Sequence, residues 1–134
     1  IYEGTTQLQV VAAIRHVTTG TYLNLINSYL EAEIKPELQS IKERIRVMAD
    51  MYAKAVEHVG KVEDQAYGDF MARRLVEMAG VTIMSCLLLN DAQRNDSFRR
   101  SAEVYLNLAQ AEVTKHAEFI NTFSPESVAE YKVL

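Results

Sequence analysis

The chain has 134 residues, of which 49% are apolar and 24% are charged, values typical of a single globular domain. Its five glycines and two prolines are too few for a disordered chain or for a turn-rich all-β fold. Its net charge of −4 leaves no general positive field that could hold a nucleic-acid backbone or an anionic membrane.

Two helices are predicted ahead of the first proline. Thr5 or Thr6 can cap the first helix, which we expect to run to about Val17 before a Thr-Thr-Gly-Thr run ends it. An amphipathic stretch from Tyr22 to Glu33 predicts the second and shorter helix. That helix must stop before Pro36, because the residue preceding a proline disfavours the helical conformation.

The third predicted helix has the most regular periodicity in the chain, and Pro36 suits its first turn. Apolar residues alternate at spacings of three and four: Leu38, Ile41, Ile45, Met48, Tyr52, Ala55 and Val59. This spacing predicts a seam that packs against a neighbouring helix at a shallow angle. Gly60 is placed to end the helix in a left-handed cap.

A long fourth helix is predicted from Asp64 to about Asn90 or Ala92. After the polar turn at 94–97, a fifth helix is expected to carry one apolar side: Phe98, Ala102, Tyr105, Ala109, Val113, Ala117 and Ile120. The run Ser124–Glu126 has the cap and first-turn chemistry of a last short helix.

The predicted fold class is all-α, because β-branched residues never alternate with polar ones over a useful length. Three long helices joined by tight turns favour antiparallel neighbours, and one of the first two helices can complete the bundle. We therefore expect an up-and-down, four-helix-bundle-like domain with additional short helices.

The most apolar stretch runs from Leu75 to Leu89. It is only about half to three-quarters as long as a membrane span and contains Glu77, so a central buried helix is expected. Cys86 lies in this stretch and, as the single cysteine, cannot form an internal disulfide. A buried inert thiol fits a reducing compartment, for which we expect the cytoplasm.

The first nine residues, Ile1 to Gln9, place a carboxylate in a short loop where a helix begins. They resemble the catalytic base loop of the acyl-CoA dehydrogenases, Ile-Tyr-Glu-Gly-Thr-x-Gln-Ile/Leu-Gln: eight of nine positions match, and Thr6 falls on the variable one. In that family several hundred residues precede the motif. The resemblance therefore implies a carboxy-terminal portion, with residues 1–20 ending the flavin and substrate domain and residues 21–134 forming an added helical domain.

The resemblance also implies an activity, namely the flavin-dependent oxidation of the Cα–Cβ bond of an acyl-CoA thioester to the trans-2-enoyl-CoA. Glu3 would be the base that removes the α-proton, and Gly4 would let the backbone approach the substrate. Thr5, Thr6 and Gln7 would contact FAD, the hydride acceptor. The implied partners are the acyl-CoA substrate, an electron-transfer flavoprotein or similar acceptor, and further copies in a homo-oligomer. The chain by itself should be inactive.

Several alternatives stay open beside this resemblance. Without the motif, Glu3 would be an ordinary first-turn acid facing a helix dipole, and the chain could be a non-enzymatic helical module for interaction or oligomerisation.

A di-iron bundle needs Glu-x-x-His pairs on two helices, which the sequence lacks. Glu112 and His116 share a helix face, and we expect an ordinary surface pair rather than a metal site. The five methionines are expected to fill the core.

Overall fold

The structure, a computed structural model, describes residues 20–133, with side chains described for residues 20–130. The first predicted helix and the base-loop motif lie outside these residues. Within the described range every regular element is helical, so the predicted all-α class is confirmed.

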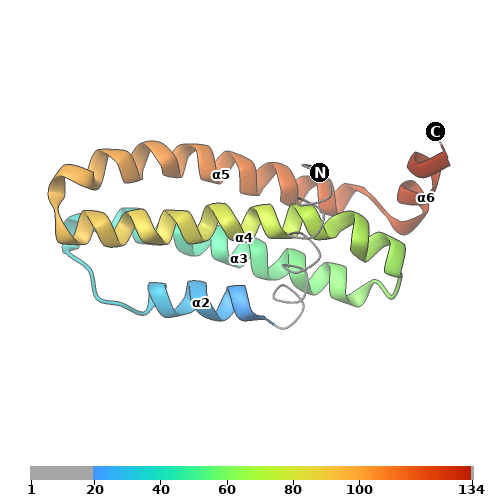
Figure 1. Ribbon diagram of the computed structural model, residues 1–134, viewed down its shortest axis with the longest axis horizontal. Coiled ribbons are helices and arrows are strands. Elements are labelled where there is room, and N and C mark those ends of the chain that lie inside the picture. The colour runs from blue at the N-terminus through green and yellow to red at the C-terminus, as the bar shows by residue number, and fades with distance from the viewer. Residues whose placement is uncertain (1–19, 134) are drawn as a thin grey trace, which may run out of the picture.

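The helices form an up-and-down bundle with one short member. In chain order they are α2 (Thr21–Leu30), α3 (Gln39–Lys61), α4 (Gln65–Arg94), α5 (Arg99–Thr122) and α6 (Pro125–Val133), with 3₁₀ turns η1 (Pro36–Leu38) and η2 (Asp96–Phe98) leading into α3 and α5. Figure 1 shows α3, α4 and α5 side by side along the length of the bundle. Helix α2 contacts α3 and α4 and takes the fourth position.

The seam on α3 is confirmed. Its buried members are at most 5% exposed: Leu38, Ile41, Ile45, Met48, Tyr52 and Ala55. Val59, at the far end of the seam, is half-buried against the same core. Because the strict alternation of three and four keeps these side chains on one stripe of the helix, α3 contacts both α4 and α5 along its length.

The predicted end of α3 is wrong in its geometry. Gly60 lies inside the helix, which continues to Lys61 and is closed by Val62 in an extended conformation (φ −83°, ψ 103°). Among the described residues only Gly20 has a positive φ, at 77°, where the chain turns into α2. Because the extended conformation of Val62 ends α3, no residue in the left-handed conformation is needed there, and Gly60 does not act as a cap.

Helix α4 begins as predicted, since a carboxylate oxygen of Asp64 accepts a hydrogen bond from the backbone N–H of Tyr67 at 2.9 Å. It ends slightly later than predicted, at Arg94. One side contacts the other helices, but Met84 and Leu87 are 44% and 40% exposed, so the expected central helix is buried on only part of its circumference. By length and hydropathy α4 could also cross a membrane, but its contacts are those of a bundle-core helix.

The predicted apolar side of helix α5 is confirmed at four of its seven residues, and the buried face is shifted from it toward Leu106 and His116. Its buried residues are Ala102, Leu106, Ala109, Val113, His116 and Ile120. Phe98, expected on the apolar side, is 46% exposed, and Tyr105 and Ala117 are only half-buried. The final helix begins as predicted, because the Ser124 hydroxyl accepts a hydrogen bond from the Ser127 N–H at 3.1 Å.

Candidate functional site

The residues predicted to carry the chemistry are Glu3, Gly4, Thr5, Thr6 and Gln7, and all five lie outside the described residues. Their contacts with substrate and flavin stay predictions. Among the features of the described part that combine polar groups with burial or a cavity, two bear on a possible site. One is a polar network between α4 and α5, and the other is a cavity between the end of α3 and the start of α4.

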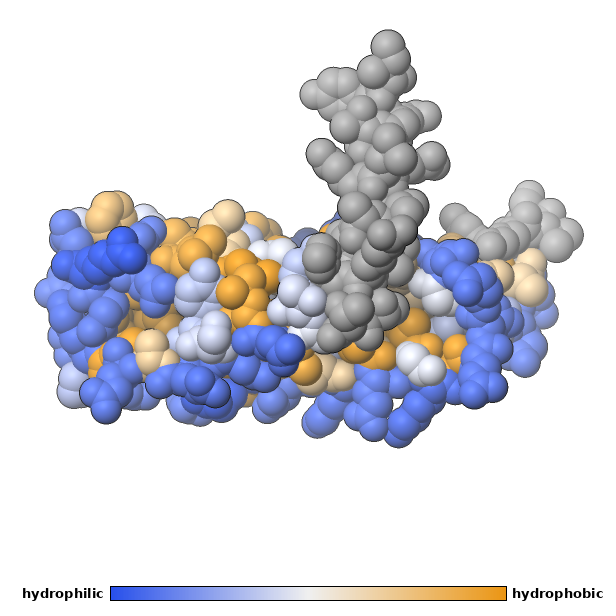
Figure 2. All heavy atoms as spheres, turned by 60° about the horizontal axis from the view of Figure 1, so that its bottom comes forward, coloured by the Kyte–Doolittle hydropathy of each residue, from blue (hydrophilic) through white to orange (hydrophobic). Residues whose placement is uncertain are grey.

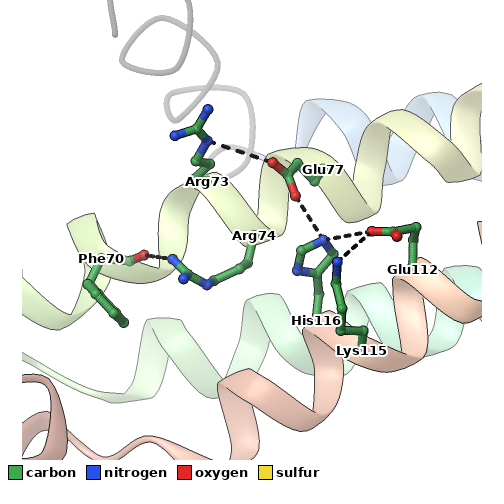
Figure 3. A network of polar contacts seen from close by, with 7 residues as sticks. All are labelled: Phe70, Arg73, Arg74, Glu77, Glu112, Lys115 and His116. Carbon is green, nitrogen blue, oxygen red and sulfur yellow. Dashed lines mark hydrogen bonds and ion pairs between the residues drawn. The ribbon is translucent and has the colours of Figure 1, made fainter. Parts of the chain in front are cut away.

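The polar network is centred on His116, whose side chain is 8% exposed on the inner face of α5 (Figure 3). Its Nε2 lies 2.8 Å from Oε2 of Glu77 on α4 and 3.5 Å from Oε2 of Glu112 one turn back on α5. Neither contact has the alignment of a hydrogen bond. Glu112 and His116 are paired as expected, but the pair is not an ordinary surface pair, because the imidazole is buried and its nearer neighbour belongs to another helix.

Burial decides the protonation state of this imidazole. Burial lowers the pKa of His116 below the usual 6.5. The negative charges of Glu77 and Glu112 raise the pKa, but the effect of burial is larger. The positive charges of Lys115 and Arg74 add to the lowering of the His116 pKa. Lys115 Nζ lies 3.0 Å from Oε2 of Glu112 and lowers the pKa of that carboxyl through a hydrogen bond. The lowered pKa favours the neutral imidazole of His116 in the contact between α4 and α5.

An arginine and two aromatic rings continue this contact. The Arg74 guanidinium donates a hydrogen bond to the Phe70 carbonyl oxygen at 2.9 Å. Its Cζ atom lies 4.7 Å from the centroid of the Phe70 ring and 4.0 Å from that of Phe119 on α5. The network thus fixes how α4 and α5 pack together, which is a structural role.

The other buried titratable groups are inert near neutral pH. Burial raises the pKa of the Cys86 thiol to about 11 and that of the Tyr52 hydroxyl to about 12. Across residues 20–130 no group of three His, Cys, Asp or Glu side chains is placed to hold a metal ion. We find no activated nucleophile in the bundle helices that the structure describes, which agrees with the prediction that Cys86 is an inert core thiol.

The cavity between α3 and α4 has a volume of about 550 Å³. Apolar side chains and two glycines form its walls, and Glu63, Asp64 and Asp69 contribute carboxylates to its lining. A flavin dinucleotide and coenzyme A both carry phosphates, which these carboxylates would repel. This cavity therefore does not fit the cofactor that the base-loop motif implies.

The comparisons with known proteins settle the family. The family described as "Acyl-CoA dehydrogenase C terminal" matches residues 18–128. This chain belongs to that family. A crystal structure of an acyl-CoA dehydrogenase family protein from Porphyromonas gingivalis is 46% identical and superposes with a TM-score of 0.81, over 85% of this chain and 99% of that chain. The comparison with curated proteins gives no match. Membership in the acyl-CoA dehydrogenase C-terminal family confirms the resemblance that the first nine residues suggested.

The contact between Glu77 and His116 is not among the features predicted from the sequence. A signal was present, because Ala109, Val113, His116 and Ile120 follow the same three-and-four spacing that identified the seam on α3. A histidine at such a position is buried with its helix face, and a lone acid in the apolar stretch of α4 is a natural neighbour for it.

Proposed function

We propose that this chain is the carboxy-terminal portion of a flavin-dependent acyl-CoA dehydrogenase, which oxidises the Cα–Cβ bond of an acyl-CoA thioester to the trans-2-enoyl-CoA. The observation that carries the proposal is the motif at Ile1–Gln9, which is followed after eight residues by the family match over residues 18–128. The motif and the match rest on different residues. A chance occurrence of the motif would not explain why this helical domain comes next.

Glu3 has the central role in this proposal. Its carboxylate takes the α-proton of the thioester, and its backbone N–H helps to hold the thioester carbonyl, which makes that proton more acidic. Gly4 leaves room for the substrate beside the backbone. FAD, when bound, supplies the acceptor for the hydride that leaves Cβ. Thr5, Thr6 and Gln7 are the residues of this chain proposed to contact it.

The partners and the compartment belong to the same proposal. An electron-transfer flavoprotein or similar acceptor would reoxidise the flavin, the chain would form a homo-oligomer, and the enzyme would be cytoplasmic. The alternative, a non-enzymatic interaction module, draws support from large apolar side chains that α3 and α5 leave exposed. Val47, Val104 and Leu108 are 53%, 54% and 57% exposed. On the face shown in Figure 2, apolar residues also reach the surface between hydrophilic edges.

The test is Glu3→Gln in the complete enzyme, with Glu126→Gln as the matched control on the exposed first turn of α6. Glutamine keeps the shape of glutamate but lacks the basic oxygen. The rate of flavin reduction by acyl-CoA, followed anaerobically by stopped-flow absorbance, should fall by roughly 10² to 10⁴ in the first variant and stay unchanged in the second.

Flavin content separates this outcome from simple misfolding. Both variants should be purified with the wild-type flavin absorbance, because neither substitution removes a bulky side chain. If Glu3→Gln retains its flavin and reduces it at the wild-type rate, the base lies elsewhere and the proposed role of the motif is wrong.

A further inference from the structure

The cavity between α3 and α4 has the form of a groove between two helices. Val56, Val59 and Gly60 form its α3 wall, spaced over the last turns of that helix. Gly68 and Ala72 lie on the α4 wall, one turn apart on a single stripe. The volume of about 550 Å³ is in the range of ligand-binding clefts.

The two glycines keep this groove open. Gly60 and Gly68 both lie inside helices, where glycine is a poor helix former, and neither has a positive φ that would require it. A Cβ atom built on either residue would meet nothing within 4 Å. Neither the backbone nor the packing of the described helices therefore explains these glycines, and what they provide is space on facing walls.

The groove also carries a negative charge. Glu63, Asp64 and Asp69 contribute carboxylates to its lining and are exposed. The cations on either side in the sequence are already paired, Lys61 with Glu57 at 2.9 Å and Arg73 with Glu77 at 3.7 Å. An occupant of this groove would need apolar groups for the walls and positive charges for these carboxylates.

We propose that this groove binds a cationic amphipathic helix of a partner polypeptide. Two helix stripes with small residues between them admit a third helix at close distance, and apolar side chains of that helix would fill the space beside Gly68. The α4 wall, from Gln65 to Leu75, extends over about 15 Å, which corresponds to a partner segment of about three turns. Lysine or arginine side chains of the segment would lie against Asp69 and its acidic neighbours. This binding site does not depend on the proposed catalytic role of the motif.

A designed peptide tests the site with the full chain. The probe is a twelve-residue amphipathic helix of leucine and lysine with one tryptophan, whose emission is selective because the chain contains no tryptophan. We expect a saturable blue shift of that emission on titration. Gly68→Leu should weaken binding by about tenfold or more, because it fills the groove. Gly80→Leu, at another helical glycine with open space and outside the groove, should change the affinity by less than about twofold.

Charge gives the second arm of the test. Asp69→Lys should weaken binding and reduce its salt dependence, and a leucine–glutamate peptide of the same pattern should not bind. Equal binding by the Gly68→Leu and Gly80→Leu variants, or equal binding of the two peptides, would overturn the proposal. So would a dimer in sedimentation that Gly68→Leu abolishes, because the occupant would then be a second copy. Circular dichroism checks that each variant is folded. If Gly68→Leu does not fold, Gly60→Leu on the facing wall of the groove repeats the test.

Discussion

Replacing Ile45 by alanine should destabilise the bundle more than any exposed change on the same helix. Ile45 is 0% exposed in the middle of the α3 seam. The substitution removes three carbon groups, each worth about 0.8 kcal/mol when buried, and leaves a cavity among packed neighbours. A loss of about 3 to 4 kcal/mol in the free energy of unfolding is therefore expected, within the range of about 2 to 5 kcal/mol seen for such changes. That is a large share of the stability of an ordinary domain.

The matched control is Val47→Ala, two residues along the same helix at a position that is 53% exposed. Its effect should lie within about 0.5 kcal/mol of zero, because little buried area is lost and alanine is the better helix former. Urea unfolding followed by circular dichroism gives both free energies, and thermal melts should show a fall of roughly 10 °C or more for Ile45→Ala alone. Equal losses from the two substitutions would refute the assignment of the buried face.

Three further predictions concern single residues of the described helices. Gly80→Ala should raise the free energy of unfolding by about 0.5 to 1 kcal/mol, because Gly80 is helical with nothing within 4 Å of a new Cβ; a loss in urea unfolding would contradict this. Because the folded-state pKa of His116 is lowered, the unfolded chain binds more protons below about pH 6.5, so wild-type stability should fall as pH drops through that value. His116→Leu should flatten this part of the pH profile, and an unchanged slope would show that other groups cause it. Cys86, whose pKa is raised to about 11, should react with iodoacetamide roughly 100-fold or more slowly in the native chain than in urea, and comparable rates would show that the thiol is accessible.

The sequence predicts most reliably those elements in which several local signals agree. On α3 the apolar spacing is strict and the intervening residues are mostly polar, so a single face can be buried, and it is. The sequence predicts helix starts at Asp64 and Ser124, and the side chain of each accepts a hydrogen bond from a backbone N–H of its helix. A side chain three residues from its partner needs no knowledge of the tertiary fold, and for that reason such local predictions succeed.

The errors occur where the sequence allows more than one face. Helix α5 has consecutive apolar residues at 104–106, so the pattern permits a face through Tyr105 as well as one through Leu106. The structure buries Leu106, and Phe98 is left exposed at the start of the helix. Helix α4 presents the same difficulty, because its apolar run does not reveal that Met84 faces outward. Only the positions of the neighbouring helices decide between such faces.

The candidate site shows a different limit. Glu3 was identified by the motif around it, and neither periodicity nor charge would have distinguished it from any other acid near a helix start. The bundle described by the structure adds His116, which is buried with a lowered pKa, and the inert thiol of Cys86, and neither has the access of a general base. Under the proposed function, stability and chemistry therefore depend on different parts of the chain. A core substitution such as Ile45→Ala should lower stability and leave the rate of flavin reduction in the folded enzyme unchanged. Glu3→Gln should instead lower the rate of flavin reduction and leave stability unchanged.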